Sequence, residues 1–160
     1  MKLSTRAEYG TRALIELASQ FEHNKPLMLQ TIAENQGLSK KYLEQLFALL
    51  KKSRLVKGIR GPSGGYQLTR PPEEITLSQI VESLEGSLAV AECLTDPELC
   101  VKNGQCATQE IWGKITAAIE QTLGAITLAE LNERHTCLTQ QLHEIPSLST
   151  SVAHCIKPKS

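Results

Sequence analysis

Residues 29–69 read LQTIAENQGLSKKYLEQLFALLKKSRLVKGIRGPSGGYQLT, and they begin with two short helical patterns separated by a tight turn. Apolar residues recur at helical spacing over about residues 29–35 and again over residues 40–52. Gly37 supplies the turn between them, and Ser39 is a natural N-cap for the second helix. A helix, a short glycine turn and a capped second helix predict a helix-turn-helix.

A hairpin pattern follows the second helix directly. Residues 55–60 and 66–69 predict two short strands, and the segment between them, Gly-Pro-Ser-Gly-Gly, consists of turn formers. A β-hairpin in this place is the wing of a winged helix-turn-helix. The chain is therefore predicted to be mainly α, with a winged helix-turn-helix domain followed by a long dimerisation helix.

Two further helices are predicted from capping patterns and apolar spacing. One runs from about residue 4 to residue 21, with Thr5 and Glu8 forming a capping box at its start. The other begins at a second capping-box pattern, made by Thr76 and Gln79, and continues for about two turns. Each helix presents one apolar face, so both are expected to pack on the helix-turn-helix.

The long helix is predicted over about residues 108–123. One stripe of this helix carries its apolar side chains: Ile111, Ile115, Ala118, Ile119 and Leu123. A stripe this regular, this late in a small chain, favours packing against the same helix of a second subunit. Packing within one chain is the alternative. Trp112, on the same helix, is expected to lie in the core, and shielding of a cluster bound by the preceding cysteines is the alternative.

Composition divides the chain into three regions. A winged helix-turn-helix DNA-binding domain is predicted over residues 1–70, and a sensor loop and dimerisation helix region over residues 71–134. Thr127 and Glu130 predict the cap of a last short helix. Residues 135–160 are rich in Ser, Thr, Pro and Gln without a period, which predicts a flexible C-terminal tail.

Charge is unevenly distributed although the formal net charge is zero. Residues 1–70 carry 12 Lys/Arg and 5 Asp/Glu, whereas residues 71–160 carry 5 Lys/Arg and 12 Asp/Glu. A basic first half indicates a polyanionic partner, and an accidental split is the alternative. No membrane span or signal peptide is visible, which predicts a cytoplasmic protein. An enzyme is not expected, because no nucleophile–base pairing or phosphate-cradling loop is found.

Three of the five cysteines, Cys93, Cys100 and Cys106, fall within a 14-residue stretch rich in turn formers. Three thiolates on one loop can bind a single metal centre and leave one coordination position open, which a sensor uses and a structural zinc site avoids. An iron–sulfur cluster is the favoured occupant. Redox-sensing thiols are the first alternative and zinc is the second.

The exposed start of the second helix of the helix-turn-helix carries the candidate DNA contacts Ser39, Lys40, Lys41, Glu44 and Gln45. The first residues of this helix meet base edges in the major groove. Gln can bridge adenine N6 and N7, and Glu can accept from the cytosine amino group, so Glu44 and Gln45 can read sequence. Lys40 and Lys41 suit phosphate contacts. A solvated helix face is the alternative.

The wing adds a second group of candidate DNA contacts. Arg60 stands at the start of a loop that can enter an adjacent minor groove, where A·T-rich DNA concentrates negative potential. Gly61 and Gly64 let the backbone approach the sugar-phosphate chain closely, and Ser63 lies between them. The adjacent helix-turn-helix, glycine-rich wing and basic residues together favour DNA binding over a solvated surface.

Three segments resemble a known family of bacterial regulators. They are residues 1–10 (MKLSTRAEYG), residues 42–46 (YLEQL) and residues 55–66 (LVKGIRGPSGGY), of which the last is the most specific. Over about residues 1–134 the chain resembles the IscR/NsrR/RirA/CymR family of winged-helix regulators. The resemblance implies a homodimer, swapped along the long helix, that binds a pseudo-palindromic operator in double-stranded DNA.

The resemblance also implies roles for individual residues. Glu44 and Gln45 match the family's base-reading positions, and Lys41 matches a further contact of the recognition helix. Arg60 matches the family's minor-groove arginine. The family divides into members whose three loop cysteines hold an iron–sulfur cluster and members such as CymR that lack one. The loop cysteines of this chain match the cluster-binding branch in position.

The fourth ligand is where the chain departs from its relatives. Six residues separate Cys93 from Cys100, one more than in IscR and NsrR, and Gln109 stands where IscR has a histidine ligand. In the NsrR-like pattern the fourth ligand is a carboxylate near the N-terminus of the partner subunit, and Glu8 occupies that position. A [2Fe–2S] cluster is expected rather than [4Fe–4S]. The alternative for Glu8 is the capping box, with no metal.

The residues and the resemblance together predict an iron–sulfur-cluster-dependent transcriptional regulator that senses iron or the redox or nitrosative state. Gain or loss of the cluster would reshape the cysteine loop and, through the long helix, change the spacing of the two wings. The alternative is a cluster-free regulator, similar to CymR, that is controlled by a partner protein or by oxidation of cysteine thiols.

Overall fold

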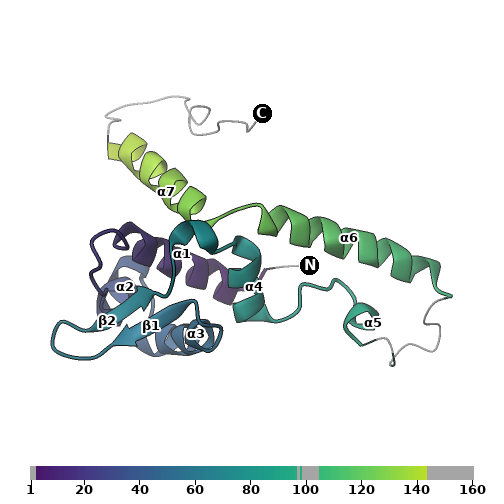
Figure 1. Cartoon of the computed structure of the whole chain (residues 1–160), viewed down its shortest axis with the longest axis horizontal. Coiled ribbons are helices and arrows are strands. Elements are labelled where there is room, and N and C mark those ends of the chain that lie inside the picture. The colour runs from purple at the N-terminus through teal and green to yellow at the C-terminus, as the bar shows by residue number, and fades with distance from the viewer. Residues whose placement is uncertain (1–2, 97, 99–104, 144–160) are drawn as a thin grey trace.

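The computed structural model describes residues 3–96, 98 and 105–143. This part of the chain is mainly helical and contains one two-stranded antiparallel sheet, which confirms the predicted fold class. Figure 1 shows α6 projecting, with α5 beside it, from the body formed by the remaining helices and the sheet. The elements are α1 (Thr5–Ser19), α2 (Leu29–Gln36), α3 (Lys40–Lys52), β1 (Val56–Ile59), β2 (Gly65–Leu68), η1 (Pro72–Glu74), α4 (Leu77–Glu85), α5 (Glu92–Thr95), α6 (Ala107–Gly124) and α7 (Leu128–His143).

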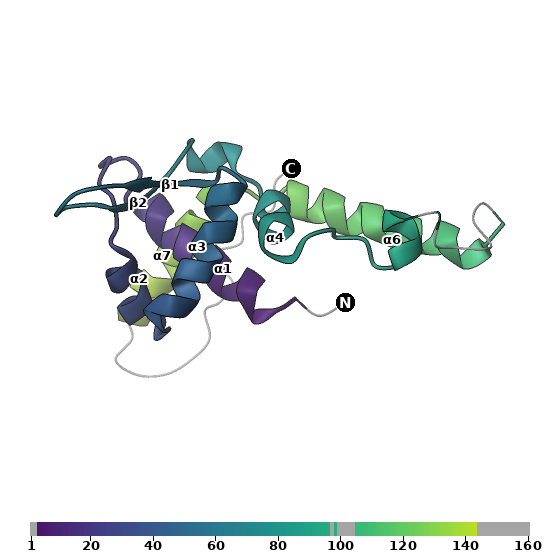
Figure 2. The same ribbon diagram turned by 90° about the horizontal axis from the view of Figure 1, so that it is seen from below.

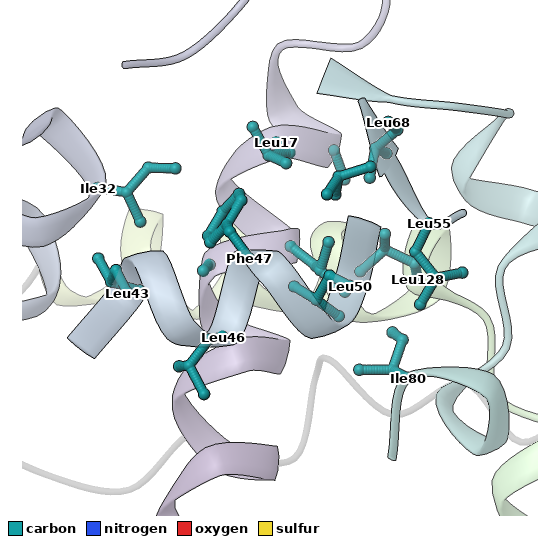
Figure 3. Packing of buried hydrophobic residues seen from close by; sticks show 14 of the residues in the cluster. Leu17, Ile32, Leu43, Leu46, Phe47, Leu50, Leu55, Leu68, Ile80 and Leu128 are labelled. Carbon is teal, nitrogen blue, oxygen red and sulfur yellow. The ribbon is translucent and has the colours of Figure 1, made fainter. Parts of the chain in front are cut away.

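The core lies where α1, α2 and α3 meet below the wing. Figure 3 shows Leu17 of α1 and Ile32 of α2 pointing toward Phe47 of α3. Phe47 and Ile32 are completely buried. Burying a side chain of this size contributes about 1.5–3 kcal/mol to stability, so this cluster holds the helix-turn-helix together.

The turn between α2 and α3 has the predicted chemistry. Gly37 ends α2 in the left-handed conformation, with a φ of 63°, which glycine adopts without steric cost. Ser39 is the N-cap of α3, and its side chain accepts a hydrogen bond from the backbone N–H of Tyr42. These two residues set the entry of α3 and confirm the sequence interpretation.

The wing is anchored on two sides. In the sheet, Val56 pairs with Leu68, and Tyr66 packs its ring against Phe47 of α3 with centroids 4.6 Å apart. The N–H of Leu27 donates to the carbonyl oxygen of Tyr66 at 3.0 Å, and the N–H of Tyr66 donates to the carbonyl oxygen of Leu27 at 2.9 Å. A Cβ on Gly65 would lie 2.3 Å from the carbonyl oxygen of Leu27, so this bridge requires glycine.

The start of α1 differs from the prediction. Thr5 and Glu8 do not form the capping box; Ser4 is the N-cap, and its side chain accepts from the N–H of Arg6. The carboxylate of Glu85, at the end of α4, accepts hydrogen bonds from the Ser4 hydroxyl and from the N–H of Ala7. A side chain distant in sequence therefore satisfies the helix start. The capping box of Thr76 and Gln79 is confirmed.

The last helix is longer than predicted. Thr127 and Glu130 form the expected capping box, with N···O distances of 3.0 and 3.2 Å, but α7 continues to His143. Residues 135–143 are therefore helical and not part of a flexible tail. The hydroxyl of Thr139 donates to the carbonyl oxygen of His135 at 2.8 Å, so the helix satisfies this polar side chain itself. Residues 144–160 of the predicted tail lie outside the described part of the chain.

The chain that follows α6 returns to the body. The N–H of Leu77 donates to the carbonyl oxygen of Ile126, and the N–H of Leu128 donates to that of Ile75, both at 2.8 Å. Leu128 is completely buried. α7 packs against α1, and Figures 1 and 2 both show α6 extending to the opposite side. Because its C-terminal end is held in this way, α6 projects with its free end at the cysteine loop.

Candidate DNA interface and cysteine loop

The amphipathic pattern of α3 sets the orientation of its candidate DNA contacts. Leu43, Leu46 and Phe47 are buried, and they hold one face of the helix against the core. The opposite face presents four polar side chains to solvent: Lys40, Lys41, Glu44 and Gln45. Ser39 stands exposed at the helix start, where it forms the N-cap. The five predicted contact residues of α3 thus share one accessible surface.

A groove of about 410 Å³ separates α3 from the wing. Lys40, Lys51 and Arg60 line this groove, and no Asp or Glu does. Three cations around a concave surface attract a phosphate backbone. The groove joins the exposed face of α3 to the wing loop, so one duplex could contact both.

The tip of the wing is built from glycines in required positions. Gly61 has a φ of 118°, a conformation that side chains rarely adopt. The N–H of Gly64 donates to the carbonyl oxygen of Gly61 at 3.0 Å, and a Cβ on Gly64 would lie 2.3 Å from the carbonyl oxygen of Ile59. Arg60 and Ser63 are exposed on this loop. The predicted wing contacts therefore lie at the accessible tip.

Two groove residues, Met28 and Gln30, were not predicted from the sequence. Met28 is the N-cap residue of α2, and 48% of its surface is exposed. Gln30 follows it in the first turn of α2. The sequence held one signal for Met28. Methionine lacks the side-chain oxygen that usually caps a helix, so a methionine at an N-cap suggests a role other than capping. Its position on the groove makes it available for contact with a sugar or a thymine methyl group.

The cysteine loop begins and ends next to α6. Cys93 lies in the single-turn helix α5, and Cys106 is the N-cap residue of α6. Both are half-buried, and Cys106 Sγ lies 2.9 Å from the hydroxyl oxygen of Thr108. Leu94 approaches α6 at Gly113, which brings α5 against the helix. The third predicted ligand, Cys100, lies outside the described residues.

Glu8 is on α1, away from these cysteines. Its carboxylate forms an exposed ion pair with Arg12 at 2.8 Å. Figures 1 and 2 show α5 and the start of α6 standing apart from α1. Among the residues that the structure describes, no three His, Cys, Asp or Glu side chains form a potential metal site. Within a single chain, Glu8 therefore does not lie next to Cys93 or Cys106.

The projecting helix α6 exposes much of its apolar stripe. Ile111 is 50% exposed, Ile115 is 38% exposed, and Thr116 is the only residue of α6 that is buried. Trp112 is 41% exposed, so the prediction that it lies in the core is wrong for the single chain. Apolar side chains gathered on one helix face typically mark an interaction surface.

The Rrf2 family, described as an iron-dependent transcriptional regulator, matches residues 3–134. The chain belongs to the Rrf2 family. Among curated relatives, the HTH-type transcriptional regulator CymR of Bacillus subtilis is 40% identical over 131 residues, covering 82% of this chain and 89% of CymR. The Rrf2 match thus extends from α1 into α7.

Two solved structures show the same fold. CymR, the global cysteine regulator of B. subtilis, superposes with a TM-score of 0.70 at 36% identity, covering 83% of this chain and 97% of CymR. IscR from T. potens gives a TM-score of 0.67 at 37% identity, covering 92% and 93% of the two chains. The protein is therefore a winged-helix transcriptional regulator that binds DNA, and not an enzyme. Over the described residues, no helix is long and apolar enough to cross a membrane.

Proposed function

We propose that this protein is a homodimeric, iron–sulfur-dependent regulator that binds a pseudo-palindromic operator in the cytoplasm and responds to iron or to the redox or nitrosative state. One observation carries the proposal: Cys93 and Cys106 bracket the loop at the free end of α6, the helix with the exposed apolar stripe. A ligand change at the loop would therefore act directly on the surface proposed to join the subunits.

The donor set fits an iron–sulfur cluster. Cys93 and Cys106 offer half-buried sulfur donors, and Cys100 supplies a third cysteine in the segment between them. Thiolates are the ligands that these clusters require, and an oxygen ligand can complete the set. Glu8 is the proposed fourth ligand, contributed by the partner subunit. The bound cluster, proposed to be [2Fe–2S], would make the loop sensitive to iron supply and oxidation.

The residues between the loop and α1 offer a route for coupling. The N–H of Val90 donates to the hydroxyl of Thr116 on α6 at 3.2 Å. Further along, Ala7 of α1, Val81 of α4 and Leu88 form a small apolar cluster with Leu123 of α6 at its edge. Movement of α6 would therefore press on the start of α1 and the end of α4, and so on the attached helix-turn-helix.

Anaerobic purification tests this function. The protein should contain iron and acid-labile sulfide in equal amounts, and its affinity for an operator selected from random duplex DNA should change when the cluster is removed. A colourless, iron-free protein that binds the operator normally would contradict the proposal.

A cluster-free regulator is the second candidate, favoured by the structural similarity to CymR. In that case a partner protein or oxidation of the loop thiols would control DNA binding. Alanine variants of Cys93, Cys100 and Cys106 separate the two modes of control. A partner response that survives in the triple variant would favour the second candidate.

Glu8→Gln is expected to lower cluster retention if Glu8 is a ligand. The variant keeps the size of the side chain but removes the negative charge, which weakens binding to iron. It also breaks the ion pair with Arg12, so Arg12→Gln is the matched control, because it breaks the same pair and leaves the carboxylate intact. Iron per subunit should fall severalfold more in Glu8→Gln than in Arg12→Gln. Equal iron content in the two variants would exclude Glu8 as a ligand.

Arg60→Ala is expected to weaken binding by about tenfold on operators with A·T-rich flanks and much less on G·C-rich flanks, because a narrow minor groove concentrates negative potential. The side chain is exposed, so the substitution should not affect folding. Lys41→Ala is the comparison, since loss of a phosphate contact should weaken binding equally on both kinds of DNA. Fluorescence anisotropy at fixed salt measures both. A uniform loss in Arg60→Ala would argue against minor-groove contact.

A further inference from the structure

A second hollow lies at the base of the wing, between the sheet and the segment that follows α1. Its volume is about 220 Å³. Leu17 and Leu68, which belong to the core, form part of its apolar wall together with Phe21. Lys25 and Lys57 are among its polar lining residues. The hollow therefore combines an apolar surface with positive charge.

This hollow lies at the base of the wing, whereas the DNA groove lies nearer the wing tip. Lys57 and Gln67 form the cross-strand pair that lines the hollow, and the next pair toward the tip, Gly58 and Tyr66, lines the groove beside α3. The two concave surfaces share no lining residue. A ligand in the hollow and a duplex in the groove would thus contact different residues.

The charges around the hollow have one sign. Lys25, Lys57 and Arg70 line it, and no Asp or Glu does. Arg70 donates from Nη2 to Oε1 of Gln79 at 2.7 Å, and both residues also line a neighbouring hollow that contains Glu82. Arg70 therefore adds positive charge beside the hollow, while Lys25 and Lys57 are the cations available for direct contact with an anion.

The hollow also joins two segments that are far apart in sequence. Gln67 of β2 donates from Nε2 to the carbonyl oxygen of Asn24 at 2.7 Å, which ties the wing to the segment after α1. Lys25 lies on that segment and Lys57 on β1. An anion between these two ammonium groups would add a second link of the same kind, so its binding would stiffen the wing.

We infer that this hollow is a binding site for a small organic anion, with a compact apolar body against Leu17 and Phe21 and a single phosphate or carboxylate facing the two lysines. The volume is below the range of about 300–1,000 Å³ that holds drug-sized ligands, which limits the body to about one ring. This site is separate from the cysteine loop and from the DNA groove. A ligand bound here would therefore act on the wing independently of the cysteine loop.

Phenyl phosphate is the probe. In a titration of the full chain followed by backbone amide NMR, saturable shifts are expected at Lys57, Gln67 and Thr69. Loss of a charge-assisted contact should weaken binding about tenfold in Lys57→Gln and in Lys25→Gln. Lys114→Gln is the control, because it removes the same charge from an exposed site on α6. Phenol should not bind, and inorganic phosphate should bind more weakly than phenyl phosphate.

Three results would overturn the inference. One is the absence of saturable shifts up to about 10 mM phenyl phosphate. Another is equal affinity in Lys57→Gln and Lys114→Gln. The last is a Lys57→Gln variant that loses affinity for operator DNA while it binds phenyl phosphate normally, since that would make Lys57 a contact for the DNA backbone.

Discussion

Cys106→Ala is expected to yield a colourless protein with almost no iron. With Cys106 removed, the loop retains only two of its three thiolate donors, which cannot hold an iron–sulfur cluster without a replacement ligand. The substitution should leave most of α6 helical, because Cys106 is only half-buried and lies at the N-cap of an 18-residue helix. Iron and sulfide assays on anaerobic protein measure the effect, and circular dichroism checks the helix content.

Cys137→Ala provides the control for this experiment. It also removes one sulfur, but from a disulfide-bonded cysteine on α7, away from the cysteine loop. Iron content should stay at the wild-type level in this variant. If Cys106→Ala retained wild-type iron as well, the cluster would not be held by the loop, and regulation by thiol oxidation or a partner protein would become the better explanation.

Ile115→Glu is expected to convert the protein to a monomer and to weaken operator binding by about a hundredfold or more. A charge in the middle of an apolar helix interface is strongly unfavourable, and a monomer can contact only one half-site. Ile115 is already 38% exposed in the single chain, so folding of the monomer should not depend on it. Light scattering gives the oligomeric state and fluorescence anisotropy gives the affinity.

Ala117→Glu is the matched control on the same helix. Ala117 is exposed, and two residues along a helix turn the side chain by about 200°, to the other side from Ile115. This variant should remain dimeric and bind DNA normally. A dimeric Ile115→Glu protein with wild-type affinity would show that the apolar stripe of α6 does not join the subunits.

The candidate DNA interface was largely predictable because it depends on local signals. The helical period of α3 separates Leu43 and Phe47 from Glu44 and Gln45 within five residues. The glycines of the wing loop reveal its tight turn in the same way. Met28 was missed because its place in the groove depends on how α2 lies against the wing, which its unusual N-cap position alone does not reveal.

The proposed metal site was predictable only in part. Spacing identified the loop cysteines, whose chemistry is independent of the rest of the fold. Glu8 could not be assigned from one chain, because the sequence offered a capping box and the structure shows an ion pair with Arg12 instead. A ligand from a second subunit is a property of an assembly, and only the variants described above can test it.

Sequence by itself determined the order of the helices, the turn at Gly37, the N-cap at Ser39 and the glycine-rich wing, because each depends on residues only a few positions apart. Tertiary structure alone decided that Glu85 completes the start of α1, that α7 reaches His143, and that Trp112 is exposed on a projecting helix. These features arise where distant segments meet or fail to meet, and a local pattern carries no information about such contacts.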